Sequence, residues 1–424
     1  SQSPTGLPGL RSLHEAGVTG DNVTVGVIGQ RFNPSHRSLG DSVAGSRRFG
    51  GAGPLFADER HDTAVAEIVA RTAPESKLYL AGVGREATPE RYAKAVQWLL
   101  ERDVDIVIDA ASYFPASAEG MDRLNDVAAT AADSGVVFVT SAGNYGNRHW
   151  AGTVDGEGWV EFAPGTEYNA LGTDTISGRT SLRLYWTGDA EFDLYLYRAS
   201  PGEDTLVAKS ATNQTDGGPH SEAIDAVLPT GRYYVAVRGG EGADGTEIEL
   251  FTSAHSFAQT SESGGMVAPA TAENVIAVGA GDAVTGQPRP YSSGGPKLDI
   301  SAPGDARTQV TGELRGSSAA APLVAGTIAL MASQNESLTP AAVQRVLQRT
   351  ATRIDGRLYL DTAGAVDAVS GREFPDPPIW ETGENTSHTV GDGVQPTQTK
   401  EELPVVADAD NGTEGAVKPP HEVV

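Results

Sequence analysis

The sequence predicts an α/β protein whose mostly parallel, doubly wound sheet is interrupted by an antiparallel β-sandwich. Residues 1–149 alternate short apolar strands with amphipathic helices, and residues 262–372 return to that pattern. Between them, residues 150–261 alternate apolar and polar side chains in short segments separated by Gly, Asp and Asn. We therefore expect one α/β domain built from residues 1–149 and 262–372, with a β-sandwich domain inserted at 150–261.

The first part of the α/β domain contains four apolar runs of strand length, at 23–28, 77–83, 104–109 and 135–142. Helical spacing of apolar residues at i, i+3 and i+4 predicts helices at 63–72, 91–102 and 121–134. Strands that are apolar throughout are buried on both faces, which indicates a parallel sheet covered by helices. Functional sites in such sheets lie at the carboxyl ends of the strands.

The inserted segment has the period of two that is typical of a sheet with one wet face. In "SLRLYW" the side chains of Leu182, Leu184 and Trp186 fall on one face and should enter the core. The same segment and "FDLYLY" are rich in aromatic residues, which could form a ligand platform. We expect Tyr185, Trp186 and Tyr195 instead to serve as core residues and cross-strand pairs.

The second part of the α/β domain begins with a predicted strand at 274–280 and a small-residue helix at 317–334. A further helix is predicted at 339–351, with Thr339 as its N-cap and Pro340 in its first position. Residues 373–424 are rich in Pro, Thr, Glu, Asp and Gly and poor in large apolar side chains. We expect this acidic tail to be disordered.

The composition limits the classes of function. The 424 residues carry a formal net charge of −25, which argues against nucleic acid or anionic lipid as a partner. Acidic surfaces of this kind are typical of proteins adapted to high salt, although an ordinary acidic secreted protein is the alternative. The chain has no cysteine, so thiol nucleophiles and Cys-based zinc sites are excluded. No stretch approaches the length of a membrane span, and we expect a protein that is secreted or at the cell surface.

Three segments place polar side chains at strand ends or helix starts of the α/β domain. His61 precedes a predicted helix, Asn144 follows a predicted strand, and Ser318 lies at a helix N-terminus. A His can take the proton of a Ser, while an Asn amide and free helical N–H groups can stabilise an oxyanion. Each residue alone is more often structural, because His is common at helix starts and Ser is a frequent helix cap.

Together the motifs "HDTAVA", "SAGN", "APATAENVIAVGA", "YSSGGP", "SAPG" and "GSSAAAPLVAGTIAL" resemble those of the subtilisin-like serine peptidases, in family order. The resemblance implies a subtilisin-like fold with His61 as general base, Ser318 as nucleophile and Asn144 as oxyanion donor. It also implies a peptide or protein substrate and no cofactor, with structural calcium sites that this sequence does not identify. The inserted segment resembles the pre-peptidase C-terminal type of sandwich.

The sequence departs from that family at the acid of the triad. The first block of the family ends in Val-Ile-Asp, whereas this chain has Val-Ile-Gly, with Gly29 in last position. Asp109 ends a strand expected to pair with 23–28, so we expect its carboxylate to enter the space beside Gly29 and orient His61. The alternative reading of Asp109 is a polar strand-end residue without a catalytic role. Asp62 is a second candidate, disfavoured because consecutive helical residues point about 100° apart.

Three functions follow from these observations. The first is an exported serine endopeptidase that forms an acyl-enzyme on Ser318 and uses a non-standard acid. The second is an inactive pseudopeptidase that binds a peptide or a partner protein. The third assigns the function to the sandwich, as an adhesion or polymer-binding module. Retention of His61, Asn144 and Ser318 favours the endopeptidase.

The segment 110–115 contains Tyr113 and Phe114, which suggest a crowded substrate cleft. We expect the inserted segment to overhang this cleft.

Overall fold

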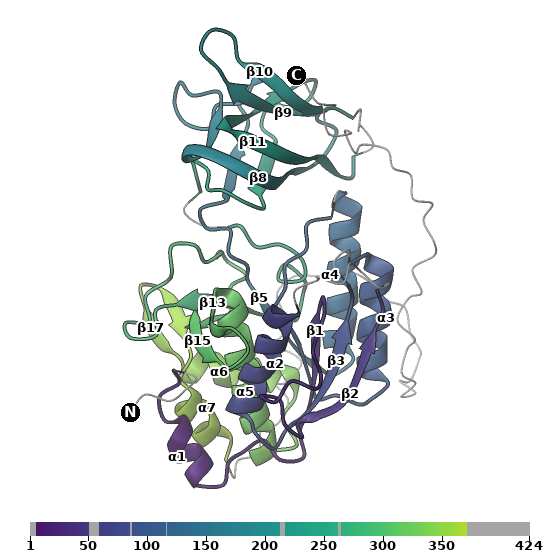
Figure 1. Ribbon diagram of the computed structural model, residues 1–424, viewed down its shortest axis with the longest axis vertical. Coiled ribbons are helices and arrows are strands. Elements are labelled where there is room, and N and C mark those ends of the chain that lie inside the picture. The colour runs from purple at the N-terminus through teal and green to yellow at the C-terminus, as the bar shows by residue number, and fades with distance from the viewer. Residues whose placement is uncertain are drawn as a thin grey trace, which may run out of the picture.

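The computed structural model describes residues 6–50, 59–84, 87–115, 117–212, 217–261 and 264–370. Two large sheets dominate this part of the chain and lie at opposite ends of the molecule (Figure 1). The predicted tail at 373–424 lies outside the described residues. None of the helices in these ranges is both long and apolar enough to cross a membrane.

The larger sheet has nine strands in the order β17-β18-β14-β13-β5-β4-β1-β3-β2. All of its pairings are parallel except that of β17 with β18. Its strands are β1 (Thr24–Gly29), β2 (Val43–Arg48), β3 (Lys77–Gly82), β4 (Ile106–Asp109), β5 (Val137–Ser141), β13 (Ile276–Gly281), β14 (Ile300–Pro303), β17 (Thr352–Ile354) and β18 (Arg357–Tyr359). The fold class, a mostly parallel α/β sheet with a separate antiparallel sheet, is therefore confirmed.

Helices cover both faces of this sheet. Ile106 and Ile108 of β4 point into a core shared with α2 (Arg60–Thr72) and α5 (Ser317–Gln334). Val107, between them, points into the opposite core with α3 (Pro89–Leu100) and α4 (Ala118–Asp133). The remaining helices are α1 (Leu10–Glu15), α6 (Pro340–Thr350) and α7 (Thr362–Val369). Alternate side chains are thus buried on opposite faces, which explains the uniformly apolar strands.

The predicted start of α6 is confirmed. The Thr339 side chain accepts a hydrogen bond from the Ala342 N–H, and Pro340 occupies the first helical position. A residue without an N–H costs nothing there, because the first N–H groups of a helix have no intrahelical partner.

The second sheet is antiparallel, with the order β10-β9-β11-β8-β12-β6 and β7 paired to β11. Its strands are β6 (His149–Thr153), β7 (Gly158–Trp159), β8 (Asn169–Thr187), β9 (Phe192–Ala199), β10 (Thr205–Ser210), β11 (Pro219–Gly239) and β12 (Glu247–Thr252). It encloses a core of its own, which includes Leu182, Leu184 and Trp186 as predicted. Tyr185, between them, lies on the other face, and its hydroxyl donates to the Pro115 carbonyl oxygen at 2.9 Å.

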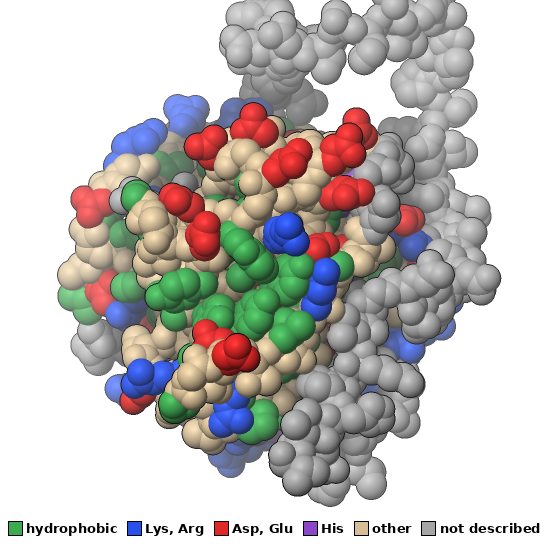
Figure 2. Space-filling view, turned by 90° about the horizontal axis from the view of Figure 1, so that it is seen from above, with side chains coloured by type: hydrophobic (Ala, Val, Ile, Leu, Met, Phe, Trp, Pro, Cys, Tyr) green, Lys and Arg blue, Asp and Glu red, His purple; other side chains and the backbone are tan. Residues whose placement is uncertain are grey.

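Viewed from above, hydrophobic side chains gather at the centre of the exposed end of the second sheet, with acidic side chains around them (Figure 2). Trp159, Tyr168 and Leu206 are among the exposed large hydrophobic residues of this unit. The Trp159 and Tyr195 rings pack edge to face, with centroids 5.1 Å apart. Tyr195 is buried, but it lies between the core residues Leu194 and Leu196 and so on the other face of β9; the expectation that it belongs to the core is wrong. Its ring stacks on that of Tyr197 in the same strand.

Candidate active site

The candidate residues come together at the carboxyl edge of the parallel sheet. His61 is the second residue of α2, and Ser318 is the second residue of α5. These two helices pack against each other on one face of the sheet. The loop after β4 and the loop after β5 reach the start of α5, so the ends of neighbouring strands supply the surroundings of Ser318.

The His61 ring is held by the next residue in the chain. Its Nδ1 atom lies 2.8 Å from Oδ1 of Asp62. The other carboxylate oxygen, Oδ2, accepts hydrogen bonds from the N–H groups of Gln30 and Arg31, at 2.7 and 2.9 Å. The Asp62 side chain is 9% exposed and the His61 side chain 45% exposed. The carboxylate of Asp62 is thus held in place by backbone donors and is positioned to accept from an Nδ1–H of His61, which would orient the ring.

Gly29 makes room for this carboxylate. A Cβ atom at position 29 would lie 2.6 Å from Cγ of Asp62 and 2.8 Å from its Cβ. These distances are far below van der Waals contact, so no larger residue fits at position 29 while Asp62 stays in place. The space above the end of β1 is therefore occupied by an acid that enters from α2.

The predicted contact between Asp109 and His61 is wrong. The predicted strand pairing is correct, since β1 pairs with β4 and Ile28 lies opposite Asp109. However, Asp109 is fully buried, and its oxygens accept from the Tyr92 hydroxyl at 2.9 Å and the Ala111 N–H at 3.0 Å. The Tyr113 hydroxyl lies 3.5 Å away. The side chain thus points to the α3 side of the sheet, and burial raises the pKa of Asp109 to about 7.

Asp62, the candidate that helix geometry disfavours, is the residue that contacts His61, although consecutive helical residues point about 100° apart. His61 and Asp62 lie in the first turn of α2, where side chains can bend around the open helix end. There the carboxylate also lies in the favourable field of the helix N-terminus.

Asn144 lies directly against the start of α5. Its Oδ1 atom accepts from the N–H and the hydroxyl of Ser317, at 2.9 and 3.1 Å. This orientation leaves the Nδ2 amide as the donor for an external oxygen. Gly316 permits the close approach, because a Cβ there would lie 2.7 Å from Nδ2 and because its φ is +105°.

Ser318 is 8% exposed, and its hydroxyl donates to the Ala110 carbonyl oxygen at 2.9 Å. Ala110 is the residue that follows β4. The nucleophile candidate therefore lies between the segment after β4 and the Asn144 loop after β5. At the start of α5 the Ser317 N–H donates to Asn144 and the Ala319 N–H to the Gly316 carbonyl oxygen, so the Ser318 N–H is the backbone candidate for stabilising an oxyanion.

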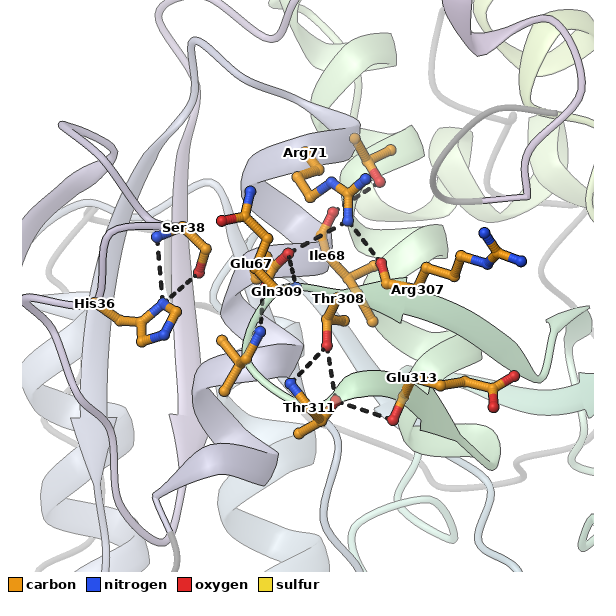
Figure 3. Close-up of polar contacts among 12 residues, drawn as sticks. His36, Ser38, Glu67, Ile68, Arg71, Arg307, Thr308, Gln309, Thr311 and Glu313 are labelled. Atoms are coloured by element: carbon orange, nitrogen blue, oxygen red, sulfur yellow. Dashed lines mark hydrogen bonds and ion pairs between the residues drawn. The ribbon is translucent and has the colours of Figure 1, made fainter. Parts of the chain in front are cut away.

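A buried carboxylate on α2 ties this helix to the chain before Ser318. Glu67 is fully buried and accepts from the N–H groups of Gln309 (2.7 Å) and Val310 (3.1 Å). These residues form the turn between β15 (Asp305–Thr308) and β16 (Gly312–Arg315). Figure 3 shows Glu67 pointing from the helix into this turn, with Arg71 beside it donating to the Arg307 carbonyl oxygen. No motif in the sequence predicts this contact.

Among the residues that the structure describes, no group of three or more His, Asp or Glu side chains is arranged to hold a metal ion. Calcium ligands remain an expectation from the resemblance.

The comparisons with known proteins agree with these observations. Residues 20–374 match the sequence model of the subtilase family of peptidases. The chain is 31% identical over 167 residues to a subtilisin of Bacillus pumilus, covering 36% of this chain and 58% of that protein. Over 137 residues it is 34% identical to an extracellular basic protease of Dichelobacter nodosus, covering 26% of this chain and 23% of that one. The chain thus spans between about a quarter and three fifths of these relatives.

Solved structures show the same fold. The CspB protease of Clostridium perfringens superimposes with a TM-score of 0.63 at 17% identity, covering 86% of this chain and 96% of that one. A lanthipeptide protease gives a TM-score of 0.50 at 15% identity, with 86% and 94% covered.

Proposed function

Because the chain belongs to the subtilase family, we propose that it is an exported serine endopeptidase in which Asp62 replaces the acid of the triad. The proposal rests on one observation above all: the Asp62 carboxylate lies 2.8 Å from Nδ1 of His61 in the space that Gly29 leaves empty. On the family resemblance, position 29 is where the acid would stand. The segment around 150–261 is proposed to be an inserted domain of this peptidase.

The first half-reaction forms an acyl-enzyme. The Ser318 hydroxyl turns from Ala110 to His61, whose Nε2 takes the proton as the Ser318 oxygen attacks the peptide carbonyl carbon. The oxyanion that forms accepts hydrogen bonds from Nδ2 of Asn144 and from the backbone at the start of α5. His61 then gives its proton to the leaving amine, the C–N bond breaks, and the acyl group stays on Ser318.

The second half-reaction uses water in place of the amine. His61 removes a proton from water, which attacks the ester carbon, and the proton returns to Ser318 as the acid product leaves. Throughout, Asp62 keeps Nδ1 protonated and stabilises the imidazolium. Its two backbone hydrogen bonds hold it in place during both half-reactions.

We propose export on the likeness to one relative. The relative from Dichelobacter nodosus is described as extracellular.

The test compares two carboxamide variants that differ only in which acid is lost. Asp62→Asn should lower kcat by about 10⁴-fold, the magnitude known for serine-peptidase triads, subtilisin's own included. Asp109→Asn should lower it by at most about tenfold, equivalent to about 1.4 kcal/mol. A fluorophosphonate probe without a side chain should label Ser318 in the unmodified protein and nothing in Ser318→Ala. Failure to label folded protein would favour the inactive, peptide-binding alternative.

A further inference from the structure

Two aromatic rings lie between the two loops that surround Ser318. Phe114 belongs to the segment after β4, four residues beyond Ala110, and Tyr145 follows Asn144 directly. Their ring centroids are 4.6 Å apart, and the rings are nearly perpendicular, at 88°. The mechanism described above uses neither ring.

A residue of the second sheet, Phe251, packs against both Phe114 and Tyr145. The ring of Phe251, on β12, lies 5.8 Å from that of Phe114 and 6.4 Å from that of Tyr145. Phe251 is 1% exposed, so it is packed on all sides. Phe114 and Tyr145 therefore cannot retreat toward the second sheet without creating a clash or a cavity.

The backbone of the Phe114 segment is also fixed. The Tyr185 hydroxyl of β8 donates to the Pro115 carbonyl oxygen at 2.9 Å. The Ala118 N–H, at the start of α4, donates to the Ser221 hydroxyl of β11 at 3.2 Å. The Tyr113 N–H donates to the Ala268 carbonyl oxygen at 3.2 Å. Hydrogen bonds on both sides of Phe114 thus fix the backbone from which its ring extends.

The position of the acyl group on Ser318 determines where the substrate side chain lies relative to Phe114 and Tyr145. An acyl carbon bonded to Oγ of Ser318, with its oxygen toward Nδ2 of Asn144, lies between the segment that begins at Ala110 and the loop at 143–145. The side chain of the residue before the cleaved bond starts one atom from that carbon. It then extends toward the space between the two loops, where the rings of Phe114 and Tyr145 contact each other.

Resting on the proposed function, we propose that Phe114 and Tyr145 determine specificity by closing this space, so that the protein cleaves after Gly and Ala and rejects large residues. The second sheet takes part through Phe251, which keeps the pair closed. The substrate class is peptides with a small residue immediately before the cleaved bond. Rejection arises because a large side chain would have to displace two rings whose movement toward the second sheet is blocked by the buried Phe251.

The experiment measures how fast Ser318 is labelled by two diaryl phosphonates that carry either an alanine or a phenylalanine side chain. The alanine probe should react at least about 100-fold faster, the discrimination that a pocket of fixed size can reach. Phe114→Ala and Tyr145→Ala should each raise the rate with the phenylalanine probe and bring the ratio toward one. Trp159→Ala is the matched control, since Trp159 lies on the exposed side of the second sheet and packs on Tyr195; it should leave the ratio unchanged.

The outcomes separate this inference from the proposed function. If the fluorophosphonate labels Ser318 while the phenylalanine probe reacts as fast as the alanine probe, the inference is overturned and the peptidase stands. If no probe labels the folded protein, the peptidase itself fails. Where one aromatic variant does not fold, the other tests the same space, and mapping of cleavage sites in denatured casein by the unmodified protein tests it without any substitution.

Discussion

Gly29 and Asp62 are complementary, because the Asp62 carboxylate occupies the volume that a side chain at position 29 would fill. A Cβ on Gly29 would lie 2.6 Å from Cγ of Asp62. From that position the carboxylate accepts two backbone hydrogen bonds beside β1 and contacts His61. The relationship implies that neither residue can change alone.

The first prediction exchanges the two residues. Gly29→Asp alone should lower both stability and activity, because two carboxylates and a Cβ would compete for one space. Combining it with Asp62→Gly should recover a large part of the lost activity, since the acid then enters from β1. Turnover and thermal unfolding of the two single variants and the double variant measure the coupling. Strictly additive losses would contradict the complementarity.

The second prediction concerns Asp109 and pH. Burial raises the pKa of Asp109 to about 7, from an ordinary value of 3.8. The folded state therefore binds the proton more tightly than the unfolded state between these pH values. Stability from this group should be greatest below about pH 4, fall as pH rises toward 7, and stay level above it. Urea unfolding across this range should show the slope, and Asp109→Asn should remove that part of it.

The third prediction concerns the buried carboxylate of Glu67. Its oxygens accept from the Gln309 and Val310 N–H groups and contact Arg71. Glu67→Gln should lower the free energy of unfolding by about 1–3 kcal/mol, because an amide cannot satisfy all of these donors.

Glu313→Gln is the matched control for Glu67, because its ion pair with Arg315 is largely exposed. Loss of such a pair should cost less than about 1 kcal/mol in urea unfolding. If both substitutions lowered the free energy of unfolding equally, the buried Glu67 contact would stabilise the protein no more than an exposed ion pair does.

The fourth prediction concerns the oxyanion donor. Asn144→Ala should lower kcat by about 10²–10³-fold with little change in KM, the loss known for the oxyanion side chain of subtilisin itself. Gly316→Ala should act in the same direction, because its Cβ would push against Nδ2 of Asn144. A change confined to KM would place Asn144 in substrate binding only.

The elements of the nine-stranded sheet that were predicted from the sequence are those with strong apolar patterns. Its edge strand β2 was missed because most of its side chains are at least partly exposed and give no apolar run. In the second sheet, the apolar–polar segments "EAIDAV" (222–227) and "GRYYVAV" (231–237) have Pro229 between them, which by itself would favour two separate strands. Both belong to the single strand β11, in which shifts of the pairing register on either side of Gly231 accommodate Pro229 and Gly231 without ending the strand.

The site was predictable in part. Motifs point to His61, Ser318 and Asn144, and the structure places all three at one edge of the sheet, while their catalytic roles stay a prediction. The acid was misplaced because strand pairing fixes which residues are neighbours but not the face toward which a side chain turns. Asp109 turns to the tyrosines of the α3 side. The sequence did hold a signal: on the family resemblance, an Asp is expected at position 29 and a Gly after the catalytic His, whereas this chain has Gly29 and Asp62.

The adjacency of His61 and Asp62 on α2 also has a consequence for how the pair responds to motion. Partners on separate elements drift apart when a helix shifts over a sheet, whereas partners on consecutive residues travel as a unit. A small shift of α2 would thus change the distance between the His61 ring and Ser318, while the His61 ring and the Asp62 carboxylate would stay together.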